Sequence, residues 1–354
     1  MTTHGSPASP APTTARQRPR QRRLWPWALG IVFTGVIGMG LGVWWTMIHM
    51  PGVSSQGPLP ASDDSLRSLD KELRQDVTAL AVTIGERNLR NRPEELGRAA
   101  RYLQTELTAA GYVVRRQVVE TPDGSCCNLE AETLGTERPG EIVVVGAHYD
   151  TARGAPGAND NTSGVAAVLA LARRFAHRKT ARTVRFVAFT NEEPPYFRTS
   201  RMGSSVYARR CRQRNEDLKA VIILETIGYY DDRPGSQHYP PPLSLLYPSR
   251  GNFIGMIGNF ASRDLVRRSV ATFRRSEPFP CEGAALPESV PGVDLSDQRS
   301  FWREGYPGLM VTDTAMNRYP FYHTLQDTID KVDFDRTARV VRGLEAVLVD
   351  LAAR

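Results

Sequence analysis

"GAHYDTARGAPGANDNTSG", residues 146–164, lies between an apolar run and a helix-forming segment. The run "EIVVV" comes directly before it, and "SGVAAVLALARRFA" begins at its end. A short apolar run followed by glycine-rich residues and a helical pattern is typical of a strand–loop–helix unit. The loop carries His148, Asp150 and Asp160. We therefore expect one histidine and two carboxylates just beyond the end of a buried strand.

Strand-like and helix-like segments alternate through most of the chain. Apolar runs predict strands at residues 112–119, 141–149, 182–190, 219–229 and 308–314, and a loop with two cysteines after the first of them. Helical periodicity predicts helices at residues 66–84, 93–111, 163–176, 204–211, 263–275 and 333–354. Such alternation predicts an α/β fold with a mostly parallel central sheet and helices on both faces.

The charge of the chain is concentrated at its N-terminus. The net charge is +7, and residues 1–23 hold five arginines and no acidic residue. The remaining residues carry 40 basic and 38 acidic side chains, so the main part of the chain is nearly neutral. A nucleic-acid-binding surface is therefore not expected. The Pro-, Ser- and Thr-rich composition of residues 1–23 predicts a disordered basic tail on the cytoplasmic side.

Residues 24–50 form an uncharged apolar segment that predicts a transmembrane helix. Arginines before the segment favour a single-pass cell-membrane protein whose residues after Pro51 lie outside the cytoplasm. A linker would then occupy residues 51–63 and an exported domain residues 64–354. A cleaved signal peptide is the competing interpretation. The pair Gly38 and Gly42 has GxxxG spacing, which leaves a homodimer open.

Four cysteines are compatible with an exported domain. Cys126 and Cys127 are adjacent, whereas Cys211 and Cys281 could pair with each other. None has the CxxC spacing of a structural zinc site, and the sequence does not fix their connectivity.

Further carboxylates follow the other predicted strands. Glu192 and Glu193 come after "VRFVAFTN", and Glu225 comes after "AVIIL". Asp160, Glu193 and Glu225 are 33 and 32 residues apart, which is about one strand–helix unit each. The carboxyl ends of parallel strands meet at one edge of a sheet, so these acids should converge there. Crowded carboxylates repel one another unless a cation offsets their charge, and a His, Asp and Glu set suits zinc.

A second histidine ligand can be sought among six histidines. His323, in "RYPFYHTLQDT", follows the predicted strand at 308–314 and is the best candidate. The other histidines lie in the tail, in the apolar segment, at the end of a cationic helix and in the long loop between Asp231 and Arg250. That loop is too long for a plain connection and is expected to border the site. Each of these residues alone is commonly a surface feature, whereas their combination at matched strand ends indicates a metal site.

The segments "GAHYDT", "GANDNTSGVA", "FTNEE", "LETIGY" and "YHTLQDT" together resemble the co-catalytic zinc aminopeptidases of metallopeptidase family 28. Glutamate carboxypeptidase belongs to the same family, and its distant relatives include the glutaminyl cyclases and the catalytically inactive transferrin receptor. The resemblance implies that His148 and Glu225 bind one zinc ion and that Glu193 and His323 bind the other. Asp160 would bridge the two ions.

The resemblance also implies roles for two further acids and a particular fold. Asp150 would orient the ring of His148, and Glu192 would be the general base. The domain would have the zinc aminopeptidase (phosphorylase/hydrolase-like) fold.

Two features depart from the family pattern. Glu225 stands where the family commonly has aspartate, so its longer arm puts the first zinc position in question. After Glu193 the chain continues "PPYFRTSRMG", which is longer than the expected turn. This segment is either a rim that alters access or a plain surface loop.

The sequence therefore predicts a membrane-anchored, zinc-dependent exopeptidase that removes N-terminal residues from a peptide substrate, with two zinc ions as cofactors. One alternative is a glutaminyl-cyclase-like zinc acyltransferase. Another is a non-catalytic binding ectodomain similar to the transferrin receptor.

Overall fold

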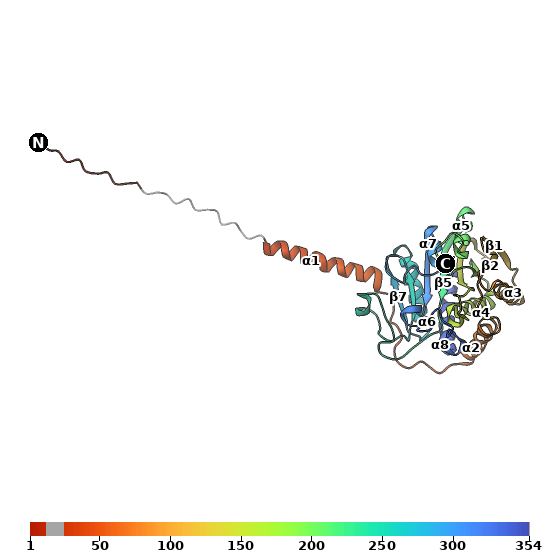
Figure 1. The fold of residues 1–354 in the computed structure, drawn as a ribbon. Helices are drawn as coiled ribbons and strands as arrows, with labels where there is room; N and C mark the ends of the chain where they lie inside the picture. Colours follow the sequence, from red (N-terminus) through yellow and green to blue (C-terminus); the bar gives the residue numbers. More distant parts are fainter. Residues whose placement is uncertain (12–24, 354) are drawn as a thin grey trace. The chain divides into compact units, whose positions relative to one another are not determined.

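The computed structural model describes residues 1–11 and 25–353, with side chains from residue 32 onward in the second range. It comprises two compact units, residues 1–43 and residues 44–354. The first contains helix α1 (Trp25–Val43) (Figure 1). The second holds all the strands of the described chain and the predicted site residues.

The structure does not support the membrane-spanning helix predicted for residues 24–50. Among the described residues, no helix combines the length and the apolar character needed to cross a membrane. The end of the predicted span belongs to the second unit. The π-helical turn η1 (Trp44–Ile48) contacts strand β7 (Cys281–Ala285), and Met50 is buried in the hydrophobic core. The linker predicted next also packs on this unit, because Ser54 Oγ accepts a hydrogen bond from Cys281 N at 3.0 Å.

One mixed sheet of eight strands forms the centre of the second unit. Its spatial order is β1-β2-β4-β3-β5-β8-β6-β7. The four central strands β4, β3, β5 and β8 are parallel to one another. The pairs β1–β2, β2–β4 and β6–β8 are antiparallel. The remaining strands are β1 (Arg115–Thr121), β2 (Gly124–Thr133), β3 (Arg138–His148), β4 (Arg182–Phe189), β5 (Asp217–Glu225), β6 (Ile254–Gly258) and β8 (Gly308–Thr312). The predicted α/β class with a mostly parallel sheet is confirmed.

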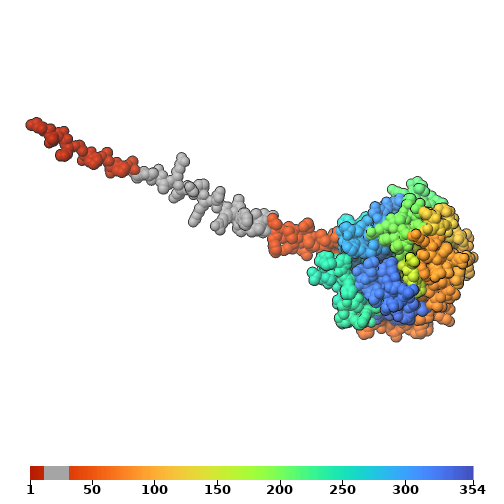
Figure 2. Space-filling model, viewed as in Figure 1, coloured from red at the N-terminus to blue at the C-terminus, as the bar shows by residue number. Residues whose placement is uncertain are grey.

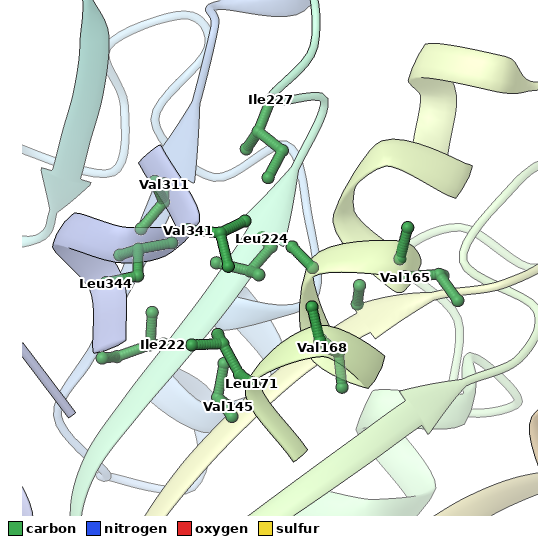
Figure 3. Packing of buried hydrophobic residues seen from close by; sticks show 14 of the residues in the cluster. Val145, Val165, Val168, Leu171, Ile222, Leu224, Ile227, Val311, Val341 and Leu344 are labelled. Carbon is green, nitrogen blue, oxygen red and sulfur yellow. The ribbon is translucent and has the colours of Figure 1, made fainter. Parts of the chain in front are cut away.

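Helices cover both faces of this sheet. The larger core lies under α2 (Asp64–Val77), α3 (Pro93–Ala109), α4 (Gly164–Phe175), α6 (Arg263–Ser276) and α8 (Phe334–Ala353). Figure 3 shows Val168 and Leu171 of α4 and Val341 and Leu344 of α8 meeting Ile222 of β5. The other face is covered by α5 (Gly203–Gln213) and α7 (Gln298–Arg303). On the surface, α8 lies beside α2, although some 270 residues separate them (Figure 2).

Short helical turns complete the fold. They are η2 (Thr78–Ile84), η3 (Ala158–Ser163), η4 (Leu243–Leu245), η5 (Phe260–Ser262), η6 (Ala315–Asn317) and η7 (Ile329–Lys331).

The two-cysteine segment predicted as a loop is strand β2. It pairs with β1 through a tight turn at Pro122 and Asp123, where Thr121 lies opposite Gly124. Pro-Asp-Gly is a turn signal between strands, and it could have revealed this hairpin. All four cysteines are free. Cys211 and Cys281, the pair considered from the sequence, lie in α5 and in β7, within different hydrophobic clusters.

The parallel register brings the predicted site residues to one edge of the sheet. His148 at the end of β3 lies opposite Phe189 at the end of β4. Gly146 of β3 pairs with Ile223 of β5, which places His148 and Glu225 at the same level. Glu225 in turn pairs with Thr312 at the end of β8. The carboxyl edge of these four strands therefore carries the candidate site.

Candidate metal centre

Two sets of three side chains could each hold a metal ion at the carboxyl edge of the sheet. The first, called the buried group, consists of His148, Asp160 and Glu225, and the second, called the open group, of Asp160, Glu193 and His323. In each group the candidate ligand atoms lie within 4.8 Å of one another. The structure thus brings together all five residues that the sequence analysis predicted as metal ligands.

The buried group converges on one imidazole nitrogen. His148 Nε2 lies 3.2 Å from Glu225 Oε2 and 3.4 Å from Asp160 Oδ1. Glu225 Oε2 also accepts a hydrogen bond of 2.6 Å from Ser296 Oγ. The longer arm of glutamate at this position therefore reaches the group and is held there by a buried serine.

The open group uses the other oxygen of the same aspartate. His323 Nε2 lies 3.0 Å from Asp160 Oδ2 and 3.2 Å from Glu193 Oε1. The ring of His323 stacks on that of Tyr322, with centroids 3.9 Å apart. Its side chain is 34% exposed, whereas those of Asp160 and Glu193 are buried. Asp160 thus faces one histidine with each carboxylate oxygen, which is the arrangement a bridging ligand requires.

Hydrogen bonds from distant segments hold Asp160 in this position. The backbone leaves helical geometry at Asp160 (φ −105°, ψ 96°), and Asp160 N donates to Asp327 Oδ2 at 3.0 Å. Asn159 N donates to Asp327 Oδ1 at 2.8 Å. Asn161 bonds the end of β5 twice, through Leu224 O at 2.8 Å and Thr226 N at 3.0 Å. These bonds tie the loop after β3 to the loops after β5 and β8.

Asp150 contacts both the histidine and the acid pair. His148 Nδ1 lies 3.2 Å from the backbone O of Asp150 and 3.6 Å from Oδ1. Glu192 N and Glu193 N each donate to one carboxylate oxygen of Asp150 at 3.1 Å. Asp150 therefore fixes the ring of His148, which leaves Nε2 facing the group, and it also anchors the backbone of the two glutamates.

Glu192 lies beside the two groups without belonging to either. Its Oε2 is 3.9 Å from His148 Nε2, and the residue is only 6% exposed. Neither group includes it as a candidate ligand. A buried carboxylate next to the ligands but outside them is where a proton-transferring group is expected.

The buried acids and the histidines of the site shift one another's pKa values. Burial and the negative charge of Asp160 raise the pKa of Glu193 to about 7. Burial also raises the pKa of Asp297 to about 7, and the charge of Glu225 contributes to this rise. Burial alone would lower the pKa of His323, but the neighbouring carboxylates of Asp160 and Glu193 raise it to about 10. Acids this crowded are stabilised by cationic partners.

Unpartnered buried atoms show that these residues fit a metal ion. Within the described part of the chain, His148 Nε2, both carboxylate oxygens of Asp160 and Glu193 Oε1 are buried and have no hydrogen-bond partner. Such orphaned atoms are rare in folded proteins unless a ligand or ion satisfies them. All four are donors that zinc accepts. The residues therefore fit two adjacent zinc ions.

A pocket adjoins the buried group and reaches the neighbour of His323 in the open group. Its empty volume is about 860 Å³, including space open to solvent, and it touches the buried group at Glu225 and the neighbour of His323 at Tyr322. Most of its walls are apolar, from Tyr239, Leu243, Tyr247, Phe253, Ile257, Leu286, Val290, Val293, Leu295, Met310 and Met316. The acidic wall residue Glu282 is paired with Arg274 at 3.2 Å. The pocket therefore offers a mainly apolar, charge-compensated surface beside the candidate ligands.

The long loop expected to border the site does so. Gln237, His238 and Pro240 of the loop between Asp231 and Arg250 also line the pocket. The residues described as lining it include none from the segment "PPYFRTSRMG" (194–203). Tyr196 of that segment instead donates to Asp123 Oδ2 at 2.5 Å, next to the β1–β2 turn. Arg198 of the same segment pairs with Asp294, which lies between the pocket residues Val293 and Leu295. The segment is therefore bound both to the β1–β2 turn and beside the pocket wall.

Several residues that support the site were missed by the sequence analysis. They are Arg87, Asn159, Asn161, Ser296, Asp297 and Asp327. The two asparagines flank Asp160, and Asn-Asp-Asn after a glycine is a visible signal of a side-chain-bonded turn. Asp327 lies close to His323 in the segment "YHTLQDT", but nothing in that segment indicates that it bonds the backbone beside Asp160. Arg87, Ser296 and Asp297 lie in segments that no local pattern connects to the ligands.

The fold and the clustered side chains define an α/β protein with a candidate two-metal centre at the carboxyl edge of its sheet. Residues 128–348 match the model of peptidase family M28. The chain belongs to this family.

Known relatives of the chain agree with this membership. The uncharacterized protein YfbL of Escherichia coli is 37% identical over 288 residues, covering 78% of this chain and 87% of YfbL. Leucine aminopeptidase 1 of Arthroderma otae is 27% identical, over 61% of this chain and 56% of that protein. The structure of the LapA aminopeptidase of Legionella pneumophila superposes with a TM-score of 0.65 at 17% identity, covering 85% and 78% of the two chains. Glutaminyl cyclases are among the other solved structures that share the fold.

Proposed function

We propose that the protein is a zinc-dependent aminopeptidase that removes N-terminal residues from peptides. The observation that carries this proposal is the position of Asp160, whose two oxygens face His148 in the buried group and His323 in the open group. A carboxylate shared in this way is suited to hold two ions side by side. Zinc is the metal that family membership implies.

In this proposal each group holds one zinc ion. His148 and Glu225 would hold the first and Glu193 and His323 the second, with Asp160 bridging. When bound, such a pair of ions polarises the scissile carbonyl and makes an attacking water more acidic. The backbone oxygen of Asp150 lies 3.2 Å from His148 Nδ1 and so holds the ring with Nε2 directed at the ions.

Glu192 is the proposed general base. Its carboxylate is next to the ligands, and its backbone N is fixed by Asp150. From this position it can take a proton from the attacking water and deliver it to the leaving amine nitrogen. Because Glu192 lies outside both groups, proton transfer does not compete with metal binding.

The pocket favours substrates whose first side chain is large and apolar. Its walls are mostly aliphatic and aromatic, and the charge of Glu282 is compensated by Arg274. A pocket built this way gains free energy from removing apolar side-chain surface from water, about 25 cal/mol per Å². Leucyl, methionyl and phenylalanyl substrates should therefore be preferred to lysyl or aspartyl ones.

A glutaminyl cyclase is the second candidate function, because glutaminyl cyclases share the fold. The completeness of both groups favours hydrolysis, since Glu225 reaches within 3.2 Å of His148 and the open group also has its three members. A cyclase that uses one zinc ion has no need of the second set. A binding ectodomain has no need of Glu192 beside the ligands.

Steady-state assays distinguish these functions. Residues 44–354 loaded with zinc would be offered leucyl and phenylalanyl anilides, the same compounds with an acetylated amine, and a peptide with N-terminal glutamine. We expect hydrolysis of the free-amine anilides, none of the acetylated ones, and no ring closure of the glutaminyl peptide. Ring closure with ammonia release would favour the cyclase, and inactivity of a zinc-loaded protein towards all substrates would favour the binding protein.

The export of this domain from the cytoplasm stays a prediction. A reporter fused after residue 62 would be active only outside the cytoplasm if the prediction holds.

A further inference from the structure

Arg87 lies beneath the candidate metal centre and outside the family match. It follows η2 in the chain and precedes residues 128–348, which match the family model. Its exposed fraction is 0%, which is exceptional for an arginine. A buried guanidinium is costly unless its donors are satisfied, so its partners indicate what it does.

The partners of Arg87 lie mainly in the loop from Tyr149 to Thr162, which follows the candidate ligand His148 and contains Asp160. Its side chain donates to Tyr149 O at 2.7 Å, Pro156 O at 2.9 Å and the hydroxyl of Thr162 at 2.5 Å. The two backbones are joined as well, since Arg87 N donates to Thr151 Oγ1 at 3.0 Å and Thr151 N donates to Arg87 O at 2.9 Å. One residue therefore contacts the beginning, the middle and the end of this loop.

The charge and the hydrogen bonds of Arg87 should have opposite effects on metal affinity. The positive charge should weaken the binding of a cation, whereas the hydrogen bonds should strengthen it by fixing the loop. Among the described residues, no carboxylate forms an ion pair with it, although the charges of Asp150, Asp160 and Asp327 are close enough to stabilise it. Burial lowers the pKa of Arg87 to about 10, so it remains protonated at neutral pH. A nearby fixed cation repels a metal cation, and its removal should by charge alone tighten metal binding.

We propose that Arg87 is a positioning residue that holds the loop from Tyr149 to Thr162 so that Asp160 can reach both groups at once. The inference rests on the proposed metal centre, and it does not depend on which peptide bond the enzyme cleaves. Loss of the Arg87 side chain should weaken metal binding because its three hydrogen bonds help to fix the geometry of the loop. Outer contacts that orient metal ligands are typically worth about 10- to 100-fold in metal affinity.

Zinc titration of the metal-free protein tests the inference without any measurement of activity. The variants Arg87→Met and Arg87→Lys would be titrated by calorimetry or against a chelating indicator. We expect Arg87→Met to raise the zinc dissociation constant about 10- to 100-fold. Arg87→Lys keeps the charge but cannot reach three acceptors along the loop, so it should also bind zinc more weakly than the wild type.

Arg339→Met is the matched control. Arg339 is another buried arginine, only 2% exposed, and it donates to Pro60 O at 2.6 Å and to Asp335 Oδ2 at 2.9 Å, away from the site. Its loss should lower thermal stability and leave zinc affinity unchanged. Thr162→Val removes a single partner of the Arg87 side chain and covers the case in which Arg87→Met does not fold. It should weaken zinc binding to a smaller degree.

Three outcomes would overturn the inference. Zinc affinity that is unchanged or higher in Arg87→Met would show that the hydrogen bonds do not position Asp160. Wild-type affinity in Arg87→Lys beside weak binding in Arg87→Met would show that the three contacts of the guanidinium along the loop are not needed. Unchanged affinity in Thr162→Val would be decisive if Arg87→Met is unfolded. If the wild type binds two zinc ions but cleaves no aminoacyl substrate, the proposed function fails while the inference on Arg87 remains tested.

Discussion

The buried group and the open group share Asp160 but differ in how they are built. His148 and Glu225 end neighbouring strands of one sheet, and their side chains are 1% and 6% exposed. His323 belongs to a loop, and its side chain is 34% exposed. The strand-borne group is fixed by the sheet itself, whereas the loop-borne group depends on side-chain contacts. The difference suggests a firmly held ion in the first and a more exchangeable, solvent-facing ion in the second.

Asp160 is the one residue common to both groups, so its loss should have the largest effect. Asp160→Asn keeps the shape of the side chain but removes the negative charge between the two positions. Because the metal ions supply several kcal/mol of transition-state stabilisation, kcat/KM should fall by about 10⁴-fold or more. Elemental analysis should show the loss of both ions. Retention of two ions with strong activity would separate Asp160 from the centre.

Glu192 lies beside both groups and tests chemistry rather than metal binding. Glu192→Gln is nearly isosteric and cannot accept a proton. We expect kcat to fall by about 10²- to 10⁴-fold with little change in KM, while zinc content and thermal stability stay close to the wild type. A Glu192→Gln enzyme with wild-type turnover would contradict the proposed mechanism even with both ions bound.

His323→Ala and His148→Ala compare the two groups directly. His323→Ala should remove the ion of the open group and leave the other in place, with a smaller loss of activity than in Asp160→Asn. His148→Ala should remove the ion of the buried group, because no other side chain at the strand ends can take the place of the histidine ligand. In the wild type, a chelator should remove one ion faster than the other. Simultaneous release of both ions in every variant would show that the groups do not differ as described.

Ser296→Ala should have the smallest effect of this series and act on the buried group alone. The hydroxyl donates to Glu225 Oε2 at 2.6 Å, so its loss frees the longer arm of glutamate. We expect affinity for the more tightly held ion to fall about tenfold, at the lower end of the range for such contacts. The affinity of the second ion should not change, and a change in both would assign Ser296 a general structural role.

The difference between the two groups also explains what the sequence could reveal. His148, Glu193 and Glu225 follow apolar runs, and parallel strands bring their ends together whatever the loops do. His323 could be chosen only by eliminating the other histidines, since nothing local places a loop residue against Glu193. Arg87 was not predictable, because it acts on the 149–162 loop from a segment without any site motif. Asp327 lies near His323 in the sequence, but its bond to Asp160 N depends on how two loops meet in the fold.

The fold shows the same division between local and distant causes. The central strands were predicted because each is a continuous apolar run buried on both faces. Strand β2 was missed because its cysteines and polar residues hide the pattern, although Pro-Asp-Gly marks its turn. The apolar composition of residues 24–50 predicted a membrane span, but no helix among the described residues has the length and apolar character for one. The contacts of η1 with β7 and the burial of Met50 depend on distant residues, so composition could not reveal them.

Anomalous diffraction at the zinc edge from crystals of zinc-loaded residues 44–354 tests the two-ion centre most directly. We expect two peaks about 3.5–4 Å apart. One should lie at bonding distance from His148 and Glu225, the other from Glu193 and His323, and Asp160 should contribute one oxygen to each. A single peak in fully loaded, active protein would contradict the account, as would peaks that Asp160 does not bridge.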